Sequence, residues 1–108
     1  MPRYIQVETT TANQEEAERI ARALLEKRLA ACVQIVPCQS LYHWQGKIEE
    51  GRELRCTIKT RDDLLAEVMA LITAMHSYET PEIVASAIID GAPAYMDWLG
   101  QELKRKEE

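Results

Sequence analysis

The order in which strand-like and helix-like stretches follow one another most restricts the fold of this chain. Residues 4–10 alternate apolar and polar side chains, as a strand with one buried face does. Residues 14–28 instead carry apolar side chains at the spacing of one helix face. The later stretches alternate between the same two patterns, and they cover residues 29–36, 40–49, 53–59, 62–75, 82–89 and 93–103. The order is therefore β-α-β-β-α-β, followed by one more helix.

This order predicts an α+β fold of the ferredoxin-like type. Right-handed crossovers between such elements give one antiparallel sheet with both main helices on the same face. We expect a single domain over residues 1–108, a βαββαβ sandwich with an additional C-terminal helix, because this length is typical of one domain. The other sheet face should be open, and it should carry the side chains of Tyr4, Gln6, Glu8, Cys32, Gln34, Arg55 and Thr57. A sheet face of this kind is expected to take part in an interaction or to be covered by another element.

Three local signals refine the element boundaries. Asn13 is suited to cap the first helix, with Glu16 three residues later as in a capping box. Pro37 has no N–H to donate to a ladder, so we expect an edge strand or a bulge there. The pair Glu50-Gly51 predicts a further irregularity in the hairpin.

The charge balance argues against two classes of partner. The chain has 13 basic and 18 acidic residues, a net charge of −5. Binding to nucleic acid or to an anionic membrane gains most of its affinity from neutralising phosphates, so we expect neither. An RNA-recognition module of the same fold also needs stacking aromatic side chains in a central strand. Residues 53–59 contain none.

The cysteine pattern and the N-terminal residues bear on the compartment. Cys32, Cys38 and Cys56 are odd in number and form no C-x-x-C pair, which favours free thiols over a disulfide framework or a structural zinc site. No apolar segment of the signal-peptide type follows Arg3, and the apolar stretch 64–75 is too short to span a bilayer. We therefore expect a cytoplasmic protein.

The turn between the second main helix and the last strand is the candidate site. It brings His76, Tyr78 and Glu79 close together in the sequence, and Pro81 stiffens it. An imidazole, a phenol and a carboxylate can bind a metal or a polar ligand. In the alternative interpretation this segment is not a binding site: the histidine only ends a helix, and the carboxylates that follow face water.

Five segments in this order resemble the CutA divalent-cation tolerance family. They are residues 29–37 (LAACVQIVP), 40–46 (SLYHWQG), 58–60 (IKT), 76–83 (HSYETPEI) and 95–98 (YMDW). The resemblance implies a homotrimer with an architecture similar to PII signalling proteins. It also implies association with tolerance to copper and other divalent ions, and no established catalytic activity. No nucleophile–base pair or glycine-rich phosphate loop marks an enzyme.

The resemblance also gives expectations for individual residues. A divalent cation, Cu(II) or another, would bind weakly in an intersubunit cleft through His76, Glu79 and Glu8. The family's copper-binding pattern has a cysteine at the end of the first strand and two adjacent histidines at the turn. Here the positions read Glu8-Thr9 and Met75-His76. Weak binding follows, because thiolate and imidazole hold copper tightly.

The alternative function is a PII-like sensor that binds an anionic or nucleotide-like ligand in the same cleft. Lys59 and Tyr78, together with Glu79, would contact that ligand. Tyr42 and Trp44 on the hairpin are expected to anchor subunits to one another, and Trp98 to pack on its own subunit. The sequence names no downstream protein partner.

Overall fold

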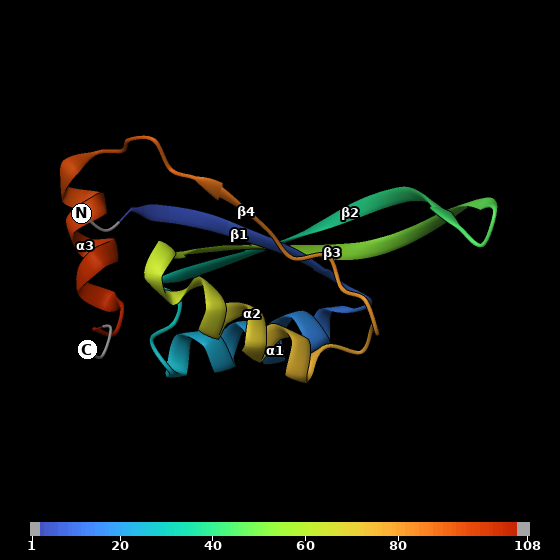
Figure 1. Cartoon of the computed structure of the whole chain (residues 1–108), viewed down its shortest axis with the longest axis horizontal. Helices are drawn as coiled ribbons and strands as arrows, with labels where there is room; N and C mark the ends of the chain where they lie inside the picture. The colour runs from blue at the N-terminus through green and yellow to red at the C-terminus, as the bar shows by residue number, and fades with distance from the viewer. Residues whose placement is uncertain (1–2, 106–108) are drawn as a thin grey trace.

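A computed structural model describes residues 3–105. In chain order the elements are β1 (Tyr4–Thr11), α1 (Gln14–Glu26), β2 (Cys32–Trp44), β3 (Lys47–Arg61), the short 3-10 helix η1 (Asp62–Leu64), α2 (Leu65–Met75), β4 (Val84–Ala87) and α3 (Pro93–Glu102). The antiparallel sheet has the order β2-β3-β1-β4, and α1 and α2 lie together on one of its faces (Figure 1). The predicted ferredoxin-like fold is confirmed. Within residues 3–105, no helix has the length and hydrophobicity needed to cross a bilayer.

The core lies between the sheet and these two helices. Val7 of β1 is opposite Ile58 of β3, and both side chains are fully buried. They pack with apolar side chains of α1 and α2, of which the largest fully buried are Ile20, Leu24, Val68 and Ile72. Burial of such a side chain contributes about 1.5–3 kcal/mol, so the alternation seen in the sequence fixes which sheet face meets the helices.

The start of α1 has the predicted cap. The Asn13 side-chain oxygen accepts a hydrogen bond from the Glu16 N–H at 2.9 Å. The Glu16 carboxylate reaches back to the N–H of Ala12 at 3.2 Å, one residue earlier than in a capping box. Glu16 is only 2% exposed, whereas a glutamate that only caps a helix is usually exposed to solvent. Its carboxylate therefore has further partners.

The β2–β3 hairpin differs from the prediction in its regularity. Pro37 lies within an uninterrupted β2, opposite Leu54, because β2 is an edge strand and pairs on one side only. Gly51 lies in register opposite Ser40, so the irregularity predicted at Glu50-Gly51 is wrong. A strand paired along its whole length tolerates one glycine.

Two strands are shorter than predicted, β2 at its start and β4 at both ends. β2 begins at Cys32, because Leu29 and Ala30 are buried in the connection from α1. β4 covers only Val84–Ala87, since it pairs only with the first half of β1. Alternation in the sequence does not reveal where a neighbouring strand ends.

The outer half of the hairpin extends beyond the rest of the molecule (Figure 1). β1 ends at the pair Thr11–Leu54, and beyond it β2 and β3 pair only with each other. This part exposes large apolar side chains: Leu41 is 65%, Tyr42 47%, Trp44 57% and Ile48 71% exposed. A surface of this kind is typical of an interaction site.

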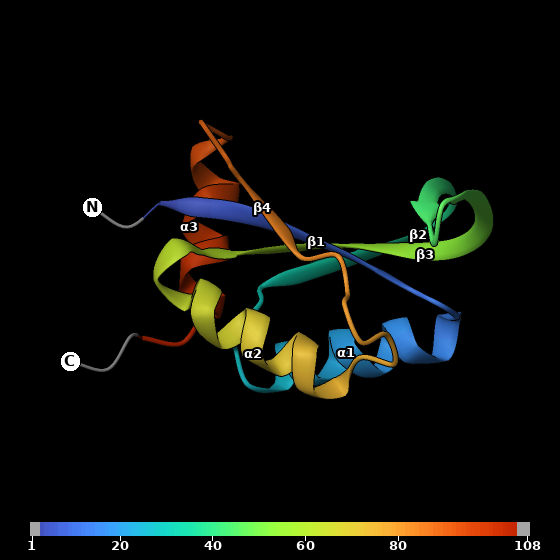
Figure 2. The same ribbon diagram turned by 45° about the vertical axis from the view of Figure 1, so that its right-hand side comes forward.

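Helix α3 lies at the opposite end of the sheet, near the start of β1 (Figure 2). Pro93 occupies its first turn as predicted, and Leu99 and Leu103 join the core. Trp98, which was expected to pack on its own subunit, contacts the ring of Tyr95 in the same helix and is 41% exposed. Leu99 faces the core, so the preceding residue, Trp98, lies at the edge of the buried helix face.

A Cβ at Gly100 of α3 would collide with the hydroxyl at the end of the Tyr4 side chain, which would have to shift. We expect Gly100→Ala to lower the free energy of unfolding by about 1 kcal/mol, the net of an overpacking cost and a gain in helix propensity. In a Tyr4→Phe background the same substitution should stabilise the protein, because the colliding atom is gone. Urea denaturation of the four chains checks both signs, and a loss unchanged by Tyr4→Phe would contradict this packing.

Candidate functional site

A groove of about 970 Å³ lies between the hairpin and the turn 76–82. Its lining comes from the end of β1, from both hairpin strands and from the turn: Thr10, Gln39, Ser40, Leu41, Tyr42, Trp44, Glu49, Glu53, Tyr78, Glu79, Thr80 and Glu82. Four of these residues are glutamates, and none is a lysine or an arginine. The groove therefore carries negative charge and attracts cations.

Glu53 is the carboxylate with the most internal contacts in this groove. One of its oxygens accepts a hydrogen bond from the Tyr78 hydroxyl at 2.7 Å, and the other accepts one from the Ser40 hydroxyl at 2.6 Å. Burial and the bond to Glu53 raise the pKa of Tyr78 well above its ordinary value, so the phenol keeps its proton. Tyr78 thus ties the turn to the hairpin and fixes one wall of the groove.

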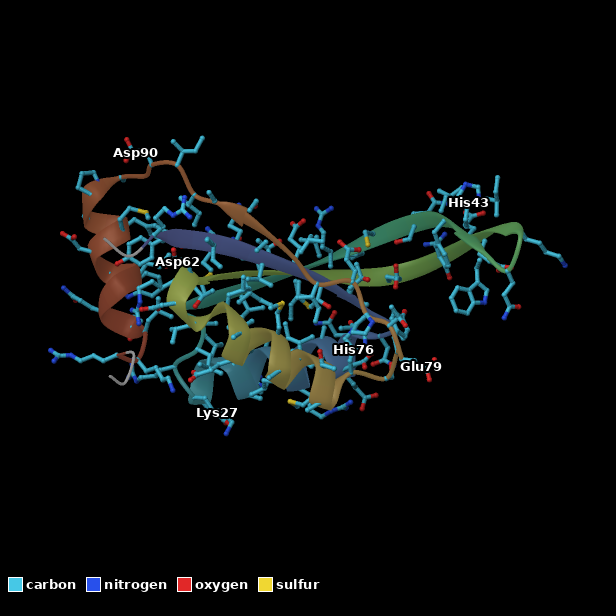
Figure 3. All side chains as sticks on the ribbon, in the orientation of Figure 1. Lys27, His43, Asp62, His76, Glu79 and Asp90 are labelled. Carbon is cyan, nitrogen blue, oxygen red and sulfur yellow. The ribbon has the colours of Figure 1, made fainter. Side chains whose placement is uncertain are left out.

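His76 faces the interior and not the groove. Its side chain is 0% exposed. The Tyr78 N–H donates to Nδ1 at 3.1 Å, so the ring proton lies on Nε2, which donates to the Thr10 carbonyl at 2.8 Å. Figure 3 shows His76 between the sheet and the helices, with Glu79 farther out on the turn. Both ring nitrogens are used within the protein.

Glu16 is the second buried polar side chain at this position. Its carboxylate accepts hydrogen bonds from the N–H groups of Ala12 and Ser77, and it lies 3.7 Å from the Nδ1 of His76. Burial alone would raise the pKa of Glu16, but the hydrogen bonds from Ser77 and Ala12 lower it below its ordinary value. One carboxylate therefore joins the start of α1 to the end of α2.

The structure does not bring the predicted metal ligands together. Glu8 lies on the open sheet face, where it accepts a hydrogen bond from Thr57 and pairs with Arg55 at 3.8 Å, whereas His76 lies on the helix side. Only Glu79 lines the groove. Among residues 3–105, no three His, Cys, Asp or Glu side chains are grouped closely enough to hold a metal ion.

The predicted anion contacts are separated as well. Lys59 donates to the Tyr95 hydroxyl at 3.3 Å and lies over that ring, at the end of the sheet near α3. Tyr78 and Glu79 both line the groove at the hairpin. A ligand in the groove of one chain therefore does not meet Lys59.

The three cysteines are free. Cys56 is 1% exposed, and burial, with the nearby charge of Glu16, raises the pKa of its thiol to about 11. It is a small apolar side chain of the core, as the alternation of β3 predicts. Cys32 and Cys38 are half-buried, on β2.

Sequence reasoning missed Glu49, Glu53 and Glu82 as members of the site. Glu82 directly follows Pro81, so its place beside Glu79 was open to prediction from the turn. Glu49 and Glu53 come from a hairpin strand that is far away in the sequence, and only the pairing of β2 with β3 brings them to the groove.

The comparisons with known proteins agree on one family. Residues 5–102 match the family model of the CutA1 divalent ion tolerance protein. The divalent-cation tolerance protein CutA of Archaeoglobus fulgidus is 47% identical, over 88% of this chain and 93% of that protein. The protein of the same name from Thermus thermophilus is 45% identical, over 83% and 88%.

Solved structures give the same fold. The structure of the periplasmic divalent cation tolerance protein CutA from Archaeoglobus fulgidus has a TM-score of 0.91 at 44% identity, over 94% of this chain and 99% of that chain.

The expectation of a cytoplasmic location is contradicted. The Archaeoglobus fulgidus structure is described as periplasmic, and the relative from Arabidopsis thaliana is described as chloroplastic. The latter is 38% identical over 88% of this chain, which spans 53% of that protein's length. Proteins that share this domain thus reach different compartments, and the domain sequence alone does not set the location.

Proposed function

Because the chain belongs to the CutA1 divalent ion tolerance protein family, we propose that it acts in divalent-cation tolerance by binding a cation in the acidic groove. The observation that supports this most is the lining, in which Glu49, Glu53, Glu79 and Glu82 meet no basic side chain. The proposed role is binding and not catalysis, since the names of the relatives denote tolerance proteins and no enzyme.

The donor set fits a hydrated, oxygen-preferring cation. Mg²⁺ keeps several waters and is held by one or two carboxylates, so it needs no group of three protein ligands. Glu79 and Glu82 are exposed and supply such carboxylates, with Glu49 across the groove. Copper fits less well, because thiolate, thioether and imidazole ligands are missing from the described lining.

The PII-like alternative has less support within one chain. An anionic ligand in the groove would meet four carboxylates and no basic side chain. Lys59 would have to come from another subunit, since its own contact is with Tyr95.

The cation site can be tested with Mn²⁺ as a paramagnetic probe. We expect Mn²⁺ to broaden the amide signals of residues 78–80, 82 and 49–53 first, because these residues surround the groove carboxylates. The double variant Glu79→Gln/Glu82→Gln should weaken Mn²⁺ binding about tenfold or more, since it removes two of the charges that attract the ion. NMR titration measures both effects.

The matched control is Glu15→Gln/Glu18→Gln, which removes two exposed carboxylates of α1 outside the groove. It should leave the broadening of residues 78–80 and 82 unchanged. Equal loss of Mn²⁺ binding in the two double variants would contradict the site, because net charge alone would then explain the binding.

We also propose that the chain assembles as a homotrimer through its hairpin. The exposed apolar side chains of the outer hairpin support this, because a short domain gains buried area by association. Trp44→Ala should weaken assembly by about 2 kcal/mol, as truncation of a buried interface tryptophan does. Light scattering across a dilution series measures the effect.

Trp98→Ala is the control for this prediction. Trp98 is also partly exposed, but it lies on α3 at the other end of the sheet. The same shift in dissociation for both variants would reject the hairpin as the main contact, and a mass near the 12.3 kDa chain for the parent would reject the trimer itself.

A further inference from the structure

The connection between β4 and α3 contains an aspartate that is followed by a glycine, Asp90-Gly91. No other aspartate or asparagine of the chain precedes a glycine. Both residues are exposed and lie outside every helix and strand. Figure 3 shows Asp90 on the outer side of this connection, at the other end of the molecule from His43 and the hairpin. The pair is therefore open to solvent and separate from the acidic groove.

The backbone nitrogen of Gly91 lies beside the carboxyl group of Asp90. Its N–H donates to Oδ1 of Asp90 at 2.8 Å and has no other hydrogen-bond partner within residues 3–105. The last backbone hydrogen bond before it runs from the Ile88 N–H to the Tyr4 carbonyl. The peptide group between Asp90 and Gly91 is thus not held in a ladder, and it can rotate until its nitrogen faces Cγ of Asp90. A glycine also lacks the Cβ that would restrict this rotation.

We propose that Asp90 is a site of spontaneous isomerisation to isoaspartate. The Gly91 nitrogen attacks Cγ of Asp90 and loses its proton, while the protonated carboxyl group loses its hydroxyl, so that one water molecule leaves and a five-membered succinimide ring closes. A water molecule then opens the ring. Attack at Cγ restores aspartate, whereas attack at the backbone carbonyl carbon gives isoaspartate, whose main chain runs through Cγ. The water lost in the first step returns in the second, so no further reactant is needed.

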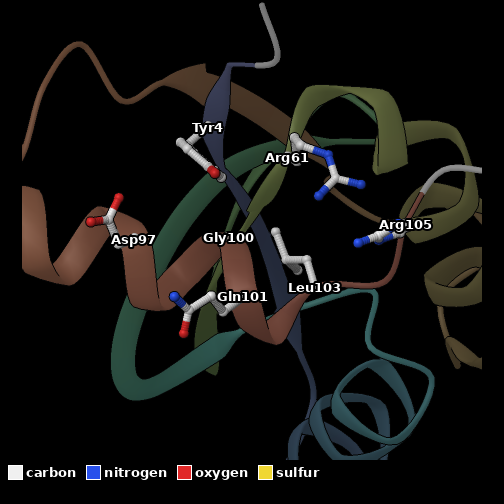
Figure 4. Close-up of a pocket in the computed structure, with 7 residues that line it drawn as sticks. All are labelled: Tyr4, Arg61, Asp97, Gly100, Gln101, Leu103 and Arg105. Atoms are coloured by element: carbon white, nitrogen blue, oxygen red, sulfur yellow. The ribbon is translucent and has the colours of Figure 1, made fainter.

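The docking of α3 does not depend on the length of this connection. Leu99 and Leu103 belong to the core, and the Tyr4 hydroxyl lies against Gly100 (Figure 4). These contacts are made by the second half of the helix and the residue after it, whereas isomerisation adds one methylene to the main chain before the first turn. The isomerised chain therefore stays folded and exposes the new carboxylate. Such a carboxylate fits a repair methyltransferase that transfers a methyl group from S-adenosylmethionine to isoaspartate.

The other aspartates of the chain serve as internal controls. Asp97 lies within α3, where the helix fixes the peptide plane of the next residue, Trp98 (Figure 4). Asp62 and Asp63 lie in η1, and each precedes a residue with a side chain. In these three positions the nitrogen that would attack is held in a helix. We therefore expect isoaspartate to form at Asp90 alone.

The test is a timed incubation of the full chain in mildly acidic and in mildly alkaline buffer. Peptide mapping by mass spectrometry locates isoaspartate, and methyl transfer by a purified isoaspartyl methyltransferase counts it. The reaction should be faster in the acidic buffer, because the carboxyl group must be protonated to lose water. Asp90 should react in the folded chain within about threefold of its rate in guanidinium chloride, whereas Asp97 should react only when unfolded. A rate at Asp90 more than about tenfold lower in the folded chain would overturn the proposal.

Variants assign the reaction to this pair. Asp90→Glu keeps the charge but would have to close a six-membered ring, so it should slow methyl transfer to the aged chain about tenfold or more. Asp97→Glu is the matched control and should change nothing. Asp90→Asn should react faster than the parent, because it loses ammonia in place of water. Undiminished methyl transfer to aged Asp90→Glu would overturn the site, since isoaspartate would then form elsewhere. Neither outcome bears on cation binding in the groove.

Discussion

Glu16→Ala should lower the free energy of unfolding by about 3 kcal/mol, because it leaves the N–H groups of Ala12 and Ser77 without an acceptor. A buried donor without a partner costs about 1–3 kcal/mol, and two are affected here. Because Glu16 joins α1 to the end of α2, its loss should also loosen the turn that follows. Urea denaturation at a fixed protein concentration measures the change, since assembly would otherwise shift it.

Two neighbouring substitutions separate this effect from loss of charge. Glu15→Ala lies in the same helical turn but is exposed, so it should change stability by less than about 0.5 kcal/mol. Glu16→Gln keeps one acceptor oxygen and should lose less than Glu16→Ala. If all three variants were equally stable, the carboxylate would not hold these two segments together.

The same carboxylate makes stability depend on pH in the acid range. The pKa of Glu16 is lowered in the folded chain from its ordinary 4.5, so the folded state binds this proton less readily than the unfolded chain. The stabilisation is therefore complete above pH 4.5 and is lost as the pH falls through the lower folded pKa. Glu16→Gln has no such proton, and the stability gap between it and the parent should close over that window.

The fold was open to prediction because it rests on periodicity. Alternation placed Val7 and Ile58 on the helix-facing side of the sheet, and the structure has both at 0% exposure. The crossover rule then gave one antiparallel sheet with both main helices on the same face. What the sequence could not give is the extent of pairing: Gly51 reads as a break, yet a partner strand along the whole hairpin keeps it in register with Ser40.

The site was predictable only as far as local sequence determines it. Glu79 and Tyr78 follow a helix end and precede a proline, so their place at the sheet edge was foreseeable. The direction of His76 was not, because it depends on Glu16, which lies 60 positions earlier, and on the Thr10 carbonyl. A short motif shows which side chains are near one another, but not whether they face solvent or the core.

His76→Ala should lower the free energy of unfolding by about 3 kcal/mol, because it empties a buried site and removes both ring hydrogen bonds. His76→Asn can still accept from the Tyr78 N–H, and His76→Gln can still reach the Thr10 carbonyl, so each should recover part of the loss. His43→Ala, at an exposed hairpin position, should cost less than about 0.5 kcal/mol. Urea denaturation of the four variants without metal distinguishes two roles for His76. If His76 serves only to bind metal, its replacement should leave the metal-free stability unchanged. If it joins the turn to β1, its replacement should lower that stability.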